Sequence, residues 1–301
     1  MKSEISPTEK FNENTKDIDV KSTIDILKAI NDEDKKVAFA VEKALPNIEK
    51  AVDIIVENFK KGGRLFYFGA GTSGRLGVLD ASECPPTFSA NKEMVQGYIA
   101  GGDSALRTAV EGAEDSIELA QKDFTRLNIT KNDTVVSISA SGNARYVVEI
   151  LKLAKERGTK AIGISNNPNA ELKNFSDVFI FLDTGAEVIS GSTRMKAGTS
   201  QKMVLNMLTT ASMIKLGKVY NNLMIDVMPT NEKLKERAKR IVKEITGADE
   251  ETVLQALQNT NYKVKEAVIL IRYSVSTERA EEMLRNSDGI LKKVFLNYPI
   301  I

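Results

Sequence analysis

The chain has 301 residues, and its 42 Lys plus Arg against 41 Asp plus Glu give a formal net charge of +1. A nearly neutral chain creates no global field that attracts nucleic acid or an acidic membrane, which favours a small-molecule role. Histidine is absent and Cys84 is the single cysteine, so a Ser-His-Asp triad, a Cys-His pair, a His-ligated zinc site and an intrachain disulfide are all excluded.

Helical periodicity follows a polar N-terminal segment that carries no export signal. Apolar spacing predicts helices over 22–34 and 35–63, the second ending at a glycine pair typical of a helix C-terminus. Short apolar runs then alternate with helical stretches. Strands are predicted over 64–70, 95–102, 133–141, 160–167 and 177–184, and helices over 73–83, 105–124 (in segments) and 144–158.

This alternation predicts an α/β fold with a doubly wound parallel sheet covered by helices on both faces. Beyond residue 193 no further strand is expected, and a long helix over about 193–218 leads into charged helices. These are predicted over 231–247, 249–260 and 263–273. The resulting division is an N-terminal helical segment (1–54), an α/β domain (55–220) and a small C-terminal helical domain (221–301).

Three polar loops follow predicted strands and open helices: GAGTSG at 69–74, SISASGN at 137–143, and GSTR at 191–194, with Lys196 one turn further on. In an open parallel sheet, ligands bind outside the carboxyl ends of the strands. Amides and hydroxyls at a helix start can hold an anion there. The alternative is that these Ser and Thr side chains merely cap helices. Three such loops at one sheet edge favour a phosphate or sugar site.

The first loop also matches the dinucleotide pattern G-x-G-x-x-G. That pattern needs an acidic residue about 20 positions later, at the end of the next strand. Glu93 precedes the next predicted strand and Asp103 comes after it. A Walker A loop fails as well, because Arg75 and Leu76 stand where Lys and Ser/Thr are required. The hydroxyl-rich loop therefore favours a sugar phosphate over a dinucleotide.

Two carboxylates are candidate proton shuttles. Glu83 lies at the end of the first α/β helix, where Pro85 and Pro86 are expected to stop the helix and fix its backbone. Glu114 lies near a helix start beside Asp115. Crowded carboxylates can raise one another's pKa toward neutrality, as general acid/base catalysis requires. Ordinary exposed surface carboxylates are the alternative for both residues.

Stretches 69–88, 95–116 and 189–208 resemble the N-acetylmuramic acid 6-phosphate etherase family, which is built on a sugar isomerase (SIS) domain with a three-layer sandwich fold. The resemblance covers nearly the whole chain. It implies a homodimeric cytoplasmic enzyme of cell-wall sugar recycling, a lyase that converts N-acetylmuramate 6-phosphate and water into N-acetylglucosamine 6-phosphate and D-lactate. It implies no cofactor, no metal, no nucleic acid and no membrane partner.

The two catalytic glutamates of the family correspond to Glu83 and Glu114. The resemblance implies that Glu114 removes the C2 proton of the ring-opened sugar. Glu83 protonates the departing lactate oxygen and then activates water. The implied substrate and phosphate ligands are Gly71, Thr72, Ser73, Ser139, Ser141, Asn143, Ser192, Thr193 and Lys196.

The chain departs from the family pattern at two places. The second loop reads SASGNARYV instead of a form like SGRTPYV, so Asn143, Ala144 and Arg145 change the chemistry beside the expected phosphate pocket. The N-terminal segment also lacks an Arg-Asn-Pro pattern before its DID sequence. Two other functions remain open: a sugar-phosphate isomerase, which retains every substituent, and a non-catalytic sugar-phosphate sensor like the glucokinase regulatory protein.

Overall fold

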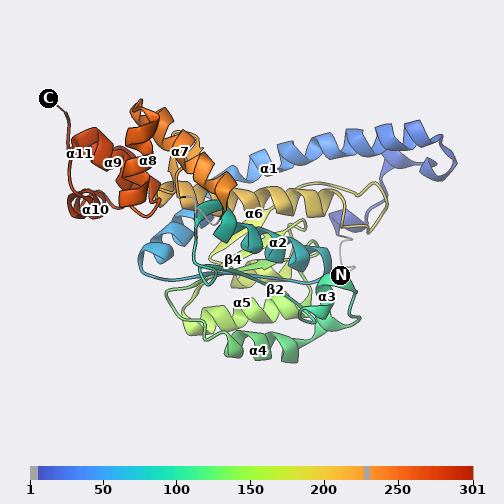
Figure 1. Cartoon of the computed structure of the whole chain (residues 1–301). Helices are drawn as coiled ribbons and strands as arrows, with labels where there is room; N and C mark the ends of the chain where they lie inside the picture. Colours follow the sequence, from blue (N-terminus) through green and yellow to red (C-terminus); the bar gives the residue numbers. More distant parts are fainter. Residues whose placement is uncertain (1–5, 227–230, 301) are drawn as a thin grey trace. The chain divides into compact units, whose positions relative to one another are not determined.

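The computed structural model describes residues 6–226 and 231–300 (Figure 1). Contacts between Cα atoms divide the chain into two compact units. We call them the sheet unit (Met1–Ser82 and Lys92–Thr209) and the helical unit (Glu83–Asn91 and Thr210–Ile301). In the described part of the chain, no helix combines the length and apolar character needed to cross a membrane. The division into domains at 54/55 and 220/221 stays a prediction.

The sheet unit is built on five parallel strands in the order β2-β1-β3-β4-β5. In this order the chain reverses its direction of winding between β1 and β3, and ligands of such sheets bind at that switch point. All residues of β1 and β3 are buried, as expected of central strands covered on both faces. The strands are β1 (Leu65–Gly69), β2 (Val95–Ile99), β3 (Thr134–Ile138), β4 (Lys160–Ser165) and β5 (Val178–Phe181).

Helices cover both faces of this sheet, which confirms the doubly wound fold. Figure 1 shows α4 and α5 on one face, and α1 with the beginnings of α2 and α6 on the other. The core between α5 and the sheet contains Phe66 and Phe68 of β1 and Tyr146 of α5, all 0% exposed. The helices of this part are α1 (Thr23–Lys60), α2 (Gly71–Phe88), α3 (Ser104–Arg107), α4 (Ile117–Arg126), α5 (Arg145–Arg157) and α6 (Lys196–Lys215).

Short 3-10 turns complete the sheet unit. Three of them, η1 (Pro7–Glu9), η2 (Glu13–Thr15) and η3 (Ile18–Val20), shape the N-terminal segment. The other two, η4 (Ala113–Asp115) and η5 (Glu171–Phe175), lie in the connections before α4 and β5.

The helical unit has its own apolar core, which includes Val242, Leu257 and Val268 at 0% exposure. The helices predicted near 231–247, 249–260 and 263–273 are confirmed. Asn231 and Asp249 accept hydrogen bonds from backbone N–H groups and cap the first two of them. The helices are α7 (Glu232–Thr246), α8 (Glu250–Asn259), α9 (Val264–Tyr273), α10 (Thr277–Arg285) and α11 (Leu291–Asn297).

Three expectations from the sequence are wrong. The two N-terminal helices form one continuous helix, α1, and α2 continues past Pro85 and Pro86 to Phe88. A proline removes one helical N–H donor, but burial of Cys84 and Phe88 on either side of the pair holds the backbone in place. Strands also return beyond residue 193, where β6 (Val219–Tyr220) and β7 (Leu223–Met224) form a short antiparallel pair.

Candidate functional site

The first and second loops leave the sheet at its switch point. Gly69 of β1 pairs with Ile138 of β3 in the parallel register, so the two loops start at the same level of the sheet. A side chain at Gly69 would place its Cβ 2.5 Å from the amide nitrogen of Gly74, so the tight first loop requires glycine there. The helix α2 begins at Gly71. The first amides of a helix have no partner within it, so they are available to an anion.

The two hydroxyls of the first loop are in different states. The Ser73 side chain is buried, and its hydroxyl donates to Gln201 Oε1 at 2.7 Å. Gln201 Nε2 in turn donates to Asn166 Oδ1 at 3.1 Å. The Thr72 hydroxyl is half-buried and has no hydrogen-bond partner among the described residues. Thr72 is therefore the hydroxyl of this loop that is open to a ligand.

The orientations of the Gln201 and Asn166 side-chain amides follow from the hydrogen bond between Asn166 and the Leu182 carbonyl. Asn166 Nδ2 donates to the backbone oxygen of Leu182 at 3.0 Å. A carbonyl can only accept, so the amide nitrogen of Asn166 must face it, and the Gln201 oxygen must then face Ser73. Gln201 and Asn166 lie outside the motifs that the sequence analysis considered. Their role depends on contacts between α6, the residue that follows β4 and the first loop, which the sequence alone does not reveal.

The second loop is a tight turn closed by its own side chains. The buried Ser139 hydroxyl accepts from the Gly142 amide at 3.0 Å, and Ser141 Oγ accepts from the Asn143 amide at 3.3 Å. Gly142 has φ +69°, and a Cβ there would lie 2.2 Å from Cβ of Ala170. The Asn143 side chain caps η5, because its Oδ1 accepts from the Glu171 amide. Ser141 is exposed, so its hydroxyl can reach a ligand.

The third loop already holds an anion of the protein itself. The Glu187 carboxylate is buried and accepts from the Lys196 and Ala197 amides, both at 2.9 Å. Burial raises the pKa of Glu187, although these two amides act in the opposite direction. The start of α6, predicted as an anion site, is thus occupied by a carboxylate. The hydroxyls of Ser192 and Thr193, both half-buried, have no hydrogen-bond partner in the described residues.

The ammonium group of Lys196 is engaged as well. It lies 2.5 Å from Glu33 Oε2, and the two side chains are 2% and 3% exposed. Burial raises the pKa of Glu33, but hydrogen bonds from Lys196, Lys36 and Asn14 outweigh burial and lower the pKa to about 2. The buried pair fastens α6 to α1. Lys196 was considered as a phosphate ligand from its position in the sequence, but in this structure it pairs with a residue of α1.

The N-terminal segment packs on the connection that leads into the third loop. The Gly191 amide donates to the Thr8 carbonyl at 3.0 Å, and the Thr15 hydroxyl donates to the Val188 carbonyl at 2.8 Å. Asn12 Nδ2 donates to the Ala186 carbonyl at 3.2 Å. These bonds cross more than 170 residues of sequence, so no local pattern predicts where this segment packs.

The two candidate catalytic glutamates lie in different units, Glu83 in the helical unit and Glu114 in the sheet unit. Both side chains are exposed. Glu83 lies on α2, and Glu114 lies on η4. The turn that carries Glu114 is fixed by Ala113, which is buried in the core, and by Gly112, which has φ +72°. Whether the two carboxylates meet on one sugar ring stays a prediction.

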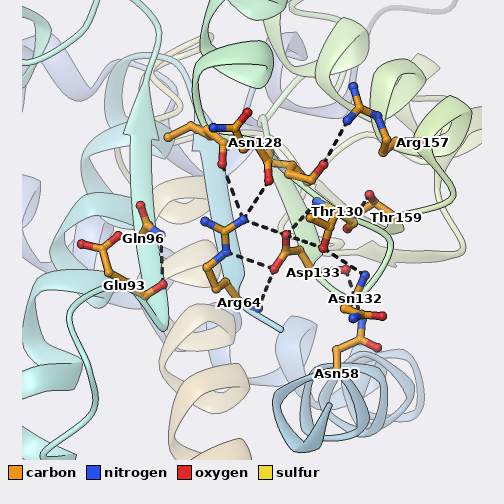
Figure 2. A network of polar contacts seen from close by, with 12 residues as sticks. Asn58, Arg64, Glu93, Gln96, Asn128, Thr130, Asn132, Asp133, Arg157 and Thr159 are labelled. Atoms are coloured by element: carbon orange, nitrogen blue, oxygen red, sulfur yellow. Dashed lines mark hydrogen bonds and ion pairs between the residues drawn. The ribbon is translucent and has the colours of Figure 1, made fainter. Parts of the chain in front are cut away.

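The opposite edge of the sheet carries a polar network of a different kind (Figure 2). Asp133, 2% exposed, accepts from Arg64 Nη2 at 2.9 Å and from the Arg64 and Thr130 amides at 2.8 Å each. Asn58 of α1 donates to the Asp133 carbonyl and to the Thr134 hydroxyl. These residues join the amino ends of β1 and β3, so they support the sheet on the side away from the loops. Across the described ranges, no cluster of three or more Cys, Asp and Glu residues could hold a metal ion.

A doubly wound sheet with glycine- and hydroxyl-rich loops at its switch point is the architecture of a ligand-binding α/β domain, and the family models identify this one as a SIS domain. Two family models match the chain: the glucokinase regulatory protein N-terminal SIS domain over residues 47–155 and the SIS domain over residues 114–211. The fold is similar to that of a phosphoheptose isomerase from Neisseria gonorrhoeae, with a TM-score of 0.50 and 18% identity. That similarity covers 64% of this chain and 98% of the isomerase.

Similarity over the full length is much higher within one family. The chain is 55% identical to an N-acetylmuramic acid 6-phosphate etherase of Caldanaerobacter subterraneus, over 94% of this chain and 93% of that protein. It is 52% identical to N-acetylmuramic acid 6-phosphate etherase 1 of Bacillus licheniformis, over 97% and 96%, and to the etherase of Clostridium acetobutylicum, over 95% of both chains. The chain belongs to the N-acetylmuramic acid 6-phosphate etherase family.

Proposed function

We propose that this chain cleaves the D-lactyl ether of N-acetylmuramate 6-phosphate and yields N-acetylglucosamine 6-phosphate and D-lactate. The observation that carries the proposal is an identity of 51–55% to proteins named as this etherase, over at least 94% of the chain. An isomerase has less support, because the similarity to isomerases extends over the fold alone. A non-catalytic sensor has less support, because the glucokinase regulatory protein model matches residues 47–155, whereas the etherases match at least 94% of the chain.

Carboxylates suffice for this chemistry. An ether oxygen at C3 is a poor leaving group, but in the ring-opened sugar C3 is β to the C1 aldehyde, and the carbonyl acidifies the C2 proton. Removal of that proton allows the C3–O bond to break, with the electron pair leaving on the lactate oxygen. Water then adds to C3 of the unsaturated aldehyde, and a proton returns to C2. Two acid/base groups carry both halves of the reaction.

We assign Glu114 to the C2 proton and Glu83 to the lactate oxygen and the incoming water. Both side chains are exposed and therefore accessible to a ligand, as surface carboxylates in general are. The absence of histidine from the sequence also leaves carboxylates as the natural proton carriers. Glu114 returns its proton to C2 in the second half of the cycle, so both glutamates end as they began.

The phosphoryl group is proposed to bind between the first two loops. The amides at the start of α2 and the hydroxyls of Thr72 and Ser141 can donate to phosphate oxygens without a net positive field. Ser73 donates to Gln201 and Asn143 caps η5. Ser139 and Ser141 each accept from a loop amide, but Ser139 is buried whereas Ser141 is exposed, so we assign Ser141 to the phosphate. In the third loop, we assign the Ser192 and Thr193 hydroxyls to the rest of the substrate, because Glu187 occupies the amides of α6. Lys196 is proposed to hold this loop through Glu33 rather than to bind phosphate.

We further propose a cytoplasmic homodimer. The first half of α1 exposes Ile24 (58%), Leu27 (55%) and Phe39 (64%), which fall on one side of a helix at 100° per residue. The same side also carries the exposed Lys28, Lys35 and Glu42, so we propose that a mixed apolar and charged surface of α1 meets the same surface of a second copy. Leu27→Asp should convert the dimer to a monomer in light scattering with size exclusion. A wild-type monomer at micromolar concentration would refute the dimer.

A product assay tests the main proposal. The wild-type chain should release D-lactate from N-acetylmuramate 6-phosphate, whereas an isomerase would leave the lactyl group attached. Glu83→Ala should abolish lactate release but largely keep C2 proton exchange with solvent. Glu114→Gln should lose both reactions, and the matched control Glu111→Gln, exposed three residues earlier, should keep both. Equal loss of both reactions in Glu83→Ala would overturn the assignment of roles.

A further inference from the structure

Arg75 connects two parts of the proposed site that are distant in sequence. It lies in the first turns of α2, directly after the first loop. Its Nε donates to the Leu106 carbonyl at 2.9 Å and its Nη2 to the Ala105 carbonyl at 2.7 Å. Both carbonyls belong to the connection between β2 and α4, residues 100–116, which also carries Glu114.

The two carbonyls need such a donor. They belong to α3, a helix of only four residues, and the last carbonyls of a helix have no partner within it. The Thr108 amide donates to the Ser104 carbonyl, so it is not a donor for the Ala105 and Leu106 carbonyls. The planar guanidinium presents several donors in a fixed fork, so one side chain can bond both neighbouring carbonyls at once. A lysine ammonium on a flexible stem offers no such geometry.

Two further contacts in residues 100–116 restrict the backbone that leads to Glu114. At Gly101, φ is +90°, and a Cβ would lie 3.1 Å from Cβ of Val110, so the segment folds back on itself there. Ala113 then enters the apolar core beside α5. Glu114 thus follows a segment held at three points: the turn at Gly101, the Arg75 contact and Ala113. Arg75 is the point that belongs to another element of the site, the helix that opens at the first loop.

We propose that Arg75 is a positioning residue for Glu114. By bonding the carbonyls of Ala105 and Leu106, it fixes the backbone that carries the C2 base relative to the helix start that receives the phosphoryl group. A substrate anchored at the first loop then presents C2 at a set distance from the Glu114 carboxylate. This inference rests on the proposed function, because it takes Glu114 as the base.

Steady-state kinetics of Arg75→Ala and Arg75→Lys test the proposal. Misplacement of a catalytic group by about 1 Å can cost about a hundredfold in rate. We therefore expect kcat for lactate release to fall about a hundredfold in Arg75→Ala, with KM changed far less. Arg75→Lys should not restore kcat, whereas added guanidinium at millimolar concentration should partly restore it in Arg75→Ala. Arg107→Ala, an exposed arginine of the same connection, is the matched control and should behave as wild type.

Hydrogen exchange separates positioning from folding. Amides of residues 101–116 should exchange faster in Arg75→Ala, while those of β3 and α5 keep their wild-type protection. A wild-type kcat in Arg75→Ala, an unchanged exchange of 101–116, or an equal loss in Arg107→Ala would each overturn the proposal. If the wild-type chain released no lactate, the proposed function would fail, and exchange over 101–116 would still decide whether Arg75 holds this segment.

Discussion

Replacing Asp133 by Asn should destabilise the sheet unit and leave the chemistry at the opposite edge intact. The Asp133 carboxylate accepts from the amide, Nε and Nη2 of Arg64 and from the amide and hydroxyl of Thr130 (Figure 2). Asparagine has nearly the same size but only one acceptor oxygen. Its NH₂ group must then face either the amide and Nε of Arg64, or Arg64 Nη2 together with the amide and hydroxyl of Thr130.

The magnitude follows from burial. Losing a hydrogen bond to a charged group costs about 1.5–3 kcal/mol, and removing one member of a fully buried ion pair costs about 3–5 kcal/mol. Asp133 is 2% exposed, but Arg64 is 29% exposed, so water can partly solvate the guanidinium after the substitution. We therefore expect the free energy of unfolding to fall by about 2–3 kcal/mol at pH 7.

The pH dependence gives a second readout. Burial raises the pKa of Asp133, but the bonds from Arg64 and Thr130 outweigh burial, so the pKa in the folded chain lies below its ordinary value of 3.8. A carboxylate with a lowered pKa stabilises the fold above its unfolded pKa, and this contribution is lost as the pH falls through the folded pKa. The difference in unfolding free energy between wild type and Asp133→Asn should be largest at pH 6–7 and decrease below about pH 4.

Urea unfolding followed by circular dichroism measures both effects, with Asp34→Asn on the exposed side of α1 as the control. Lactate release below the unfolding transition should match wild type, because Asp133 lies at the amino ends of the strands. The reasoning is refuted if Asp133→Asn unfolds at the wild-type urea concentration at pH 7. It is also refuted if the stability difference grows on acidification.

Three further substitutions probe the loops. Gly142→Ala, at φ +69° with Ala170 in the way, should cost about 1–3 kcal/mol of stability and raise KM, measured by urea unfolding and lactate release. Thr72→Val removes the open hydroxyl of the first loop, so KM should rise about tenfold with kcat nearly unchanged, and a changed kcat alone would contradict this role. Lys196→Met leaves the Glu33 carboxylate without its buried partner and with only the half-exposed Lys36, which should lower the unfolding free energy by about 3 kcal/mol in thermal or urea unfolding.

The parallel sheet could be predicted from the sequence because its signals are local. Each of the five long strands is a short apolar run, and each is followed by a polar loop or a turn. The same local signals placed the first and second loops at the carboxyl edge of the sheet. The strand order β2-β1-β3-β4-β5 puts both loops at the switch point, where ligands of such sheets bind. This position favours the first and second loops as the sugar-phosphate site.

Other features depend on contacts between distant residues. Lys196 was predicted as a phosphate ligand because it follows the third loop in the sequence. In the structure it pairs with Glu33, which lies 163 residues earlier in the chain. Pro85 and Pro86 were expected to end α2 because propensity is a local rule, whereas burial of the flanking Cys84 and Phe88 is a tertiary effect. The strands β6 and β7 have two residues each, too few for any alternation to be recognised.

The difference between the third loop and the first two has a physical cause that the sequence conceals. At a helix start, a serine or threonine indicates unpaired amides, but the residue that pairs them can come from anywhere in the chain. At α6 the protein supplies Glu187, so those amides have no remaining capacity for phosphate. A phosphate competing for this position would have to displace a buried carboxylate and leave it unpaired beside a second anion, at a cost of several kcal/mol. Phosphate binding is therefore expected at α2 rather than α6, because Glu187 occupies the amides of α6.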